Sequence, residues 1–163
     1  MAKEFEIDVA GSDLLSKNYS IVVSENNTSN IKCFKFSESI IEKLKSYFNG
    51  KSDRGKIMLK IRIYCIVIYY LFKNMKIKDN TPINIHICRD FQGHERDISS
   101  QLKYFLENLL KLKINISYGR LNKESNADKY AYISLRDTKN LFKGYVAISP
   151  EDIERFLKKN SKE

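Results

Sequence analysis

Cysteine and histidine are scarce in this sequence, and the few that occur stand far apart. The chain of 163 residues has 3 cysteines and 2 histidines. It has no CxxC pair and no cysteine clustered with histidine, which argues against a zinc site and against a disulfide framework. Cys33, Cys65 and Cys88 each lie in an apolar run. The sequence therefore predicts buried thiols in a reducing cytosol.

The sequence also lacks an apolar stretch long enough for a membrane. The longest run, residues 63–72, is too short to span a bilayer and is flanked by Arg62 and Lys73. The first residues lack the apolar segment of a signal peptide. We therefore expect a soluble, cytoplasmic protein with no membrane partner.

Several common catalytic patterns are missing too. The sequence has no glycine-rich phosphate loop, and it supports no Cys-His or Ser-His-Asp arrangement. It shows no internal repeat and no interdomain linker. At this length we expect a single domain, 1–163, with a substantial core.

Positive charge is what the sequence has in excess. Its 29 Lys and Arg residues outnumber its 20 Asp and Glu residues, so the net charge is +9 and the pI is about 9.4. This excess favours nucleic acid, DNA or RNA, as a partner over an acidic protein. The abundance of Lys, Ile and Asn also fits the compositional bias of an AT-rich genome, so charge alone does not decide between these explanations.

Hydrophobic periodicity predicts an α/β fold. The predicted elements are strands 5–9, 19–24 and 31–36, helices 37–50 and 52–75, strand 83–88, helix 98–112, strand 114–118, helix 127–135, an optional short strand 145–148 and a last helix from 149. The first three strands, joined by short polar turns, predict an antiparallel meander. The fourth strand follows a helical crossover and should lie parallel to its neighbour. We expect a five-stranded mixed sheet of order 3-2-1-4-5, flanked by helices.

The helix predicted over 52–75 is apolar on all sides in its middle. Such a helix is buried on more than one side. We therefore expect it to cross the sheet with Ile61, Cys65, Ile68 and Phe72 fully buried.

Asp8 stands among the apolar residues of the first strand. It either faces solvent on an edge strand or is a metal ligand near the centre of the sheet, where an unpartnered carboxylate is costly. Asp90 follows the fourth strand, and Asp128 opens the helix after the fifth. In the predicted order these three carboxylates converge and repel one another unless a divalent cation neutralises them. Carboxylate and water oxygens are ligands that Mg²⁺ and Mn²⁺ prefer.

This arrangement resembles the ribonuclease H-like superfamily. The matching pieces are Ile7-Asp8-Val9-Ala10-Gly11-Ser12, Asp90 after its strand, and Asn126-Ala127-Asp128-Lys129-Tyr130-Ala131, which is similar to the Asp-x-x-Ala pattern of the superfamily's closing helix. The resemblance covers residues 3–137, mostly as topology.

The resemblance implies phosphodiester hydrolysis by two metal ions. Asp8 would bridge both ions, and Asp90 and Asp128 would each complete one. The superfamily usually has a further acid on the helix after the third strand. Asp53 is the candidate for that position, although Asp53, Glu38 and Glu42 are also explained as acids that favour a helix N-terminus.

Basic and aromatic residues give two further hypotheses. The densest basic stretch is Lys51, Arg54, Lys56, Lys60 and Arg62. It is either solvated helix charge or a phosphate-binding track beside the site. The 10 tyrosines are able to stack on unpaired bases, although most of them lie in apolar stripes that predict core positions.

The two histidines fit ordinary structural positions. His86 alternates with Ile85 and Ile87, which predicts a strand residue. His94 and Glu95 either begin a helix or supply a base or ligand near the site.

Two rival functions stay open beside a metal-dependent nuclease. One is a nucleic-acid-binding module on the same fold whose catalytic set has decayed. The other is a phosphate-handling protein, because Asp-x-Ala-Gly-Ser before a hairpin is similar to the first phosphate loop of sugar-kinase-type ATPases. Those ATPases need two lobes, and this chain has the length of one.

Overall fold

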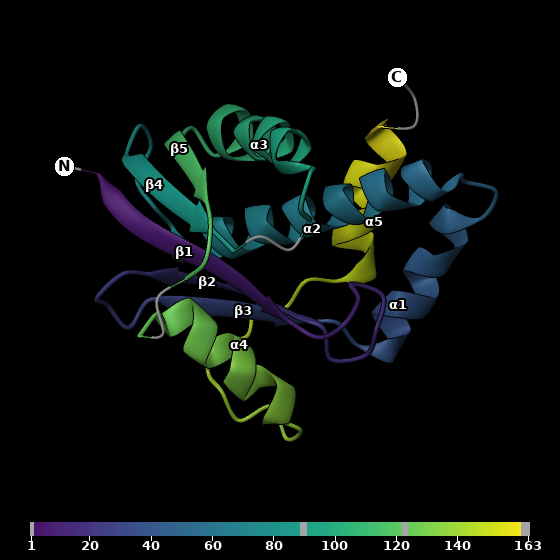
Figure 1. The fold of residues 1–163 in the computed structure, drawn as a ribbon, viewed down its shortest axis with the longest axis horizontal. Coiled ribbons are helices and arrows are strands. Elements are labelled where there is room, and N and C mark those ends of the chain that lie inside the picture. The colour runs from purple at the N-terminus through teal and green to yellow at the C-terminus, as the bar shows by residue number, and fades with distance from the viewer. Residues whose placement is uncertain (1, 89–90, 122–123, 161–163) are drawn as a thin grey trace.

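The computed structural model describes residues 2–88, 91–121 and 124–160. Its centre is a five-stranded mixed sheet of order β3-β2-β1-β4-β5 (Figure 1). The strands are β1 (Lys3–Ala10), β2 (Ser20–Glu25), β3 (Ile31–Lys35), β4 (Pro82–Ile87) and β5 (Lys113–Tyr118). The first three strands form an antiparallel meander, and β4 lies parallel to both β1 and β5. The predicted fold class and strand order are confirmed, and the topology is ribonuclease H-like.

Helices cover the two faces of the sheet unequally. They are α1 (Glu38–Lys45), the 3₁₀ turn η1 (Ser46–Phe48), α2 (Asp53–Met75), α3 (Glu95–Leu102), the π-helical segment η2 (Lys103–Leu109), α4 (Asn126–Arg136) and α5 (Pro150–Asn160). The long helix α2 packs against β2, β3, α3 and α5 in the main core, whereas α4 packs against β1 and β2 on the opposite face (Figure 1). The β4 and β5 part of that second face carries the polar side chains of Asn84, His86, Asn115 and Ser117.

The central helix α2 follows from its sequence. Ser52 caps it by accepting a hydrogen bond from the Gly55 amide, and it ends where Lys76 adopts the left-handed conformation at φ 54°. Its middle is buried on every side. The four residues predicted to be buried on this helix are all fully buried, so that prediction is confirmed.

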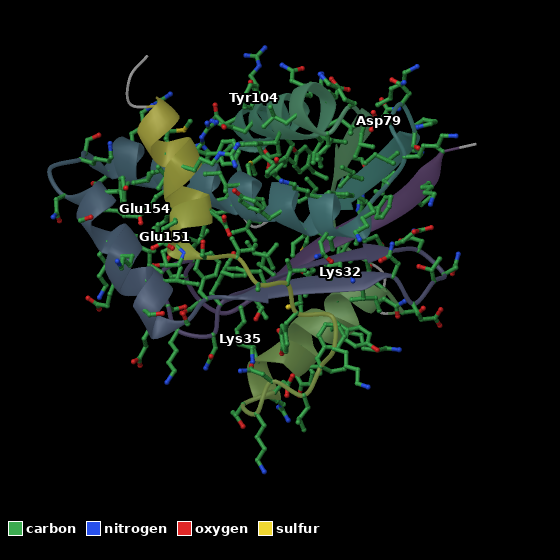
Figure 2. The ribbon with its side chains drawn as sticks, turned by 180° about the vertical axis from the view of Figure 1, so that it is seen from behind. Lys32, Lys35, Asp79, Tyr104, Glu151 and Glu154 are labelled. Carbon is green, nitrogen blue, oxygen red and sulfur yellow. The ribbon has the colours of Figure 1, made fainter. Side chains whose placement is uncertain are left out.

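The last helix, α5, is fastened to the earlier helices by tyrosines. The Tyr47 hydroxyl donates to Glu154 at 2.6 Å, and the Tyr70 hydroxyl donates to the Asp152 carbonyl oxygen at 2.9 Å. Figure 2 shows Glu154 on α5 facing the neighbouring helices. None of the described helices is both long and apolar enough to cross a membrane.

Two elements differ from the sequence-based expectation. The helix predicted over 98–112 is α-helical only as far as Leu102 and continues as the wider η2. Residues 145–148 do not form a strand. Tyr145 makes a single parallel bridge to Cys33, because the Cys33 amide donates to Gly144 and the Val146 amide donates to Cys33. The preceding residues turn around Asp137, whose carboxylate accepts from three groups, and this prevents a regular strand.

Candidate active site

Asp8 lies on the central strand β1, with β2 on one side and β4 on the other. Its side chain shares the α4 face of the sheet with Val22, its partner on β2. The residue is only 7% exposed. The alternative of a solvent-facing carboxylate on an edge strand is therefore wrong, and Asp8 is a buried acid that needs partners.

Asp128 reaches Asp8 from the first turn of α4. The Ser125 hydroxyl caps this helix by accepting a hydrogen bond from the Asp128 amide at 3.4 Å. Ala127 and Ala131 are buried against the sheet beneath it. Because these two side chains are small, α4 lies close to β1, and the Asp128 carboxyl comes within hydrogen-bonding contact of Asp8. The Ala-Asp-x-x-Ala spacing therefore has a direct packing explanation.

The pKa of Asp8 is raised from 3.8 to about 6. Burial is the largest cause, and the neighbouring Asp128 carboxyl adds to it by charge repulsion and by hydrogen bonding to the protonated form. Two donors oppose the rise: the Val9 amide, 2.8 Å from Asp8 Oδ1, and the Cys88 thiol. The pair thus combines a buried acid of raised pKa, Asp8, with an acid in an exposed position, Asp128.

Cys88 belongs to the same site. It follows β4, and its amide donates to the Ile7 carbonyl oxygen at 3.1 Å, which extends the parallel pairing by one residue. That pairing places its thiol beside Asp8. The sequence predicted a buried thiol, but Cys88 is half-buried, whereas Cys33 and Cys65 are buried as predicted. The sequence analysis missed this contact because it did not assign the register of β4 against β1. Ile87 pairs with Ile7, so Cys88 lies level with Asp8.

The other predicted acids do not complete the pair. Asp90 lies outside the described residues. Asp53 is exposed at the start of α2, and the residue of α2 that reaches the end of β1 is Lys60, paired with Asp13 at 2.8 Å. Within the part of the chain that the structure describes, no three His, Cys, Asp or Glu side chains group closely enough to hold a metal ion.

The predicted nucleic-acid-binding residues lie together on the first turns of α2 and just before it. Lys51, Arg54 and Lys56 are exposed, and Lys60 is half-buried against Asp13. No residue of α2 before Ile61 is buried. This end of the helix therefore extends beyond the core with its basic side chains in solvent, which leaves their role as a phosphate track a prediction.

A histidine and a serine face each other on the uncovered polar surface of β4 and β5. His86 Nδ1 lies 2.7 Å from Ser117 Oγ, and His86 Nε2 lies 3.4 Å from the Arg120 carbonyl oxygen. The sequence predicted only a strand residue at position 86. The second ring nitrogen faces a carbonyl rather than a carboxylate, so the pair cross-links two strands and does not form a catalytic triad.

His94 and Glu95 serve the start of α3. His94 Nδ1 lies 3.2 Å from Asp97 Oδ2, and the Gly93 amide donates to the Glu95 carboxylate. These contacts within one turn fit the helix-start interpretation.

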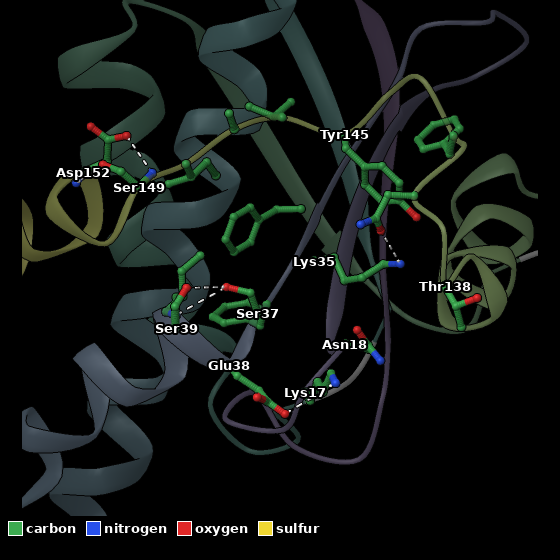
Figure 3. Close-up of a pocket in the computed structure, with 18 residues that line it drawn as sticks. Lys17, Asn18, Lys35, Ser37, Glu38, Ser39, Thr138, Tyr145, Ser149 and Asp152 are labelled. Carbon is green, nitrogen blue, oxygen red and sulfur yellow. Dashed lines mark hydrogen bonds and ion pairs between the residues drawn. The ribbon is translucent and has the colours of Figure 1, made fainter.

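A large cavity lies away from the acidic pair. It has a volume of about 1200 Å³ and opens beyond the edge strand β3, between the start of α1 and residues 138–149 (Figure 3). Lys35 reaches across one side, where its ammonium donates to the Asp137 carbonyl oxygen at 2.7 Å and to Asn140 at 3.0 Å. Lys17 on another side is paired with Glu38 at 3.4 Å. Both lysines are thus engaged within the protein.

No model of a known protein family matches this chain, and no curated protein matches it. What defines its class is the ribonuclease H-like topology, with the acidic pair Asp8 and Asp128 at the centre of the sheet.

Proposed function

We propose that this protein is a metal-dependent nuclease that hydrolyses phosphodiester bonds of DNA or RNA with Mg²⁺ or Mn²⁺. The observation that carries the proposal is the contact between Asp8 and Asp128. Two carboxyl groups separated by 120 positions in the sequence meet at a buried point of the sheet. Two ionised carboxyl groups repel each other at this contact unless a cation lies between them.

The donor set fits the proposed metal. Mg²⁺ is commonly held by one or two carboxylates while it keeps several water ligands and binds substrate phosphate. Asp8 and Asp128 supply those two carboxylates, and Asp90 is the predicted third. The Cys88 thiol is a soft ligand and a poor match for Mg²⁺. We therefore assign it the role of a hydrogen-bond donor to Asp8 and not that of a metal ligand. When bound, such an ion activates water and stabilises charge on the scissile phosphate.

The protein's own groups prepare the site for that ion. The Val9 amide holds Asp8 Oδ1 in place at 2.8 Å, and the Ser125 cap fixes the turn that carries Asp128. A nearby cation favours the charged form of a carboxyl group and so lowers the pKa of Asp8 from its raised value. The exposed cations at Lys51, Arg54 and Lys56 would hold the nucleic-acid backbone.

The test is cleavage by the parent protein and by two variants, Asp8→Asn and Asp128→Asn. The substrates are labelled single strands, duplexes, DNA–RNA hybrids and junctions, with Mg²⁺, with Mn²⁺ or with EDTA. We expect cleavage by the parent only with metal, and a loss of orders of magnitude in each variant. Glu42→Gln is the matched control, because Glu42 is a surface acid paired with Lys45 at 3.3 Å and far from the proposed chemistry.

A second candidate is a nucleic-acid-binding module without catalysis on the same topology. It is favoured by the position of Asp53, which is exposed at the far end of α2 and supplies no fourth acid to the pair. This candidate predicts binding that weakens steeply with salt, no metal-dependent cleavage by the parent, and unchanged binding by Asp8→Asn. Metal-independent binding without cleavage across the whole substrate panel would therefore replace the nuclease proposal.

A further inference from the structure

Helix α4 carries an exposed aromatic side chain one turn beyond Asp128. Asp128, Tyr132 and Arg136 are spaced four residues apart, which places them along one flank of the helix. Tyr132 is 56% exposed, and the Arg136 guanidinium lies over its ring, 4.6 Å from the ring centroid. The helix packs on the sheet through Ala127, Ala131 and Ser134, so Tyr132 contributes nothing to that contact.

The direction of α4 brings this flank past the acidic pair. At its start, Ser125 donates to Glu6 on β1 at 3.0 Å, and one turn later Asp128 contacts Asp8. At its end, the Asp137 carbonyl oxygen accepts from Lys35 on β3. The helix thus begins over β1 and ends beside β3, and Tyr132 lies about 6 Å further along its axis than Asp128.

The residues that follow Asp128, on α4 and on the segment after it, carry mostly positive charge. Lys129, Arg136, Lys139 and Lys143 lie on α4 or on the segment that follows it, and all four are exposed. Asp137 is the acid in this stretch, and its carboxylate accepts hydrogen bonds from the amides of Leu141 and Phe142. An approaching phosphate chain therefore meets cations and a stacked aromatic ring on the same surface.

We propose that Tyr132, backed by Arg136, is a stacking platform for an unpaired base of the strand bound at Asp8 and Asp128. This inference rests on the proposed function and names its substrate class, which is single-stranded or locally unpaired nucleic acid. An aromatic ring on a helix flank stacks on any exposed base face, and this is independent of base sequence. The bases of an intact duplex have no free face along the strand, so the platform selects against paired substrate.

The experiment measures binding of labelled nucleic acid by fluorescence anisotropy in EDTA, where metal-dependent cleavage cannot occur. The probes are an oligothymidylate of about 12 nucleotides and a duplex of equal length. Tyr132→Leu removes the ring and keeps an apolar side chain, whereas Tyr132→Phe keeps the ring. We expect Tyr132→Leu to weaken single-strand binding by about 5- to 100-fold and to leave duplex binding unchanged. Tyr132→Phe should bind as the parent does.

Salt dependence separates stacking from charge. Arg136→Gln should lower the salt slope of single-strand binding by about 0.7, because one phosphate contact is lost. Tyr132→Leu should leave that slope unchanged, because stacking releases no counterion. Ile133→Ser is the matched control, since Ile133 is an exposed apolar residue on the same helix outside the Asp128 flank.

Each outcome decides the inference. Parent-like single-strand binding by Tyr132→Leu, or an equal loss on duplex, overturns it. An equal loss in Ile133→Ser also overturns it, because the loss would then follow from any change on the exposed side of α4 rather than from removal of the Tyr132 ring. Tyrosine-dependent binding without any metal-dependent cleavage would support the platform and reject the nuclease. If Tyr132→Leu cleaves and binds as the parent does, the nuclease proposal is supported and the stacking platform is rejected.

Discussion

Replacing Asp8 by asparagine should stabilise the metal-free protein at neutral pH. Asparagine keeps the shape of the side chain and the oxygen that accepts from the Val9 amide at 2.8 Å, but it carries no charge. In the parent, the buried Asp8 must ionise beside Asp128 as the pH rises. The folded protein therefore loses free energy relative to the unfolded chain, in which the aspartate ionises freely.

The magnitude follows from the pKa of Asp8, which rises from 3.8 to about 6 on folding. A tenfold change in proton affinity corresponds to about 1.4 kcal/mol, so the ceiling is about 3 kcal/mol. The site is partly open to solvent beside the exposed Asp128, and solvent reduces both the cost of burying the Asp8 charge and the repulsion from Asp128, which leaves about 1–2 kcal/mol. The direction of the effect follows from proton linkage. Below pH 3.8 Asp8 is protonated in both the folded and the unfolded protein, so it has no effect on stability. The unfolding free energy falls as the pH rises from 3.8 to about 6, and above that range the full destabilisation by Asp8 is present.

The assay is urea unfolding of the parent and of Asp8→Asn in EDTA between pH 4 and 8. Every other carboxyl group is the same in both proteins, so the difference in unfolding free energy isolates Asp8. It should be near zero at pH 4 and about 1–2 kcal/mol in favour of the variant at pH 7.5. Asp53→Asn, at an exposed position, should show no such trend. A variant less stable than the parent at pH 7.5, or a difference independent of pH, would refute the reasoning.

Three further predictions concern packing and reactivity. Ile68→Ala, in the fully buried part of α2, should lower the unfolding free energy by about 2–5 kcal/mol; a loss below about 1 kcal/mol in urea unfolding would contradict the packing. In Gly144→Ala the new methyl group would overlap the Ile31 carbonyl oxygen, so amide exchange at Cys33 should accelerate; unchanged exchange would show that the segment adjusts. Under native conditions a maleimide should label the half-buried Cys88 before Cys33, because burial raises the pKa of the Cys33 thiol to about 12; mass spectrometry of the labelled protein decides the order.

The meeting of Asp8 and Asp128 was predictable because it depends on coarse features. Alternation identifies β1 as a strand, and the crossover handedness places β4 beside it. The spacing of Ala127 and Ala131 then identifies the helix face that packs on the sheet. None of these steps requires a side-chain conformation, so a local error in the prediction does not propagate to the site.

The position of Asp53 was not predictable at that level. Where a helix lies along a sheet is set by the packing of its buried residues, and in α2 these begin only at Ile61. Eight residues separate the two positions, so Asp53 lies about 12 Å along the helix from the first buried residue. Sequence pattern identifies the buried stripe but not how far the helix extends beyond it.

Residues 138–149 escaped prediction for a different reason. Their path is determined by hydrogen bonds to the Asp137 carboxylate from Leu141, Phe142 and Tyr145. Such hydrogen bonds leave no periodic pattern in the sequence. The apolar residues at 145–148 form a pattern that is typical of a strand and so led to a wrong prediction. Cys88 likewise required the register of β4 against β1, which only the three-dimensional structure provides.

The small residues beneath α4 have a consequence for when the site exists. Ala127 and Ala131 pack in a minor hydrophobic cluster with Ala10, Val22 and Cys33, separate from the main core around α2. This cluster is smaller than the main core, so we expect detachment of α4 to cost less free energy than unfolding of the whole chain. Each such opening would separate Asp128 from Asp8. The lifetime of the acidic pair would then be set by the docking of a single helix rather than by the stability of the whole protein.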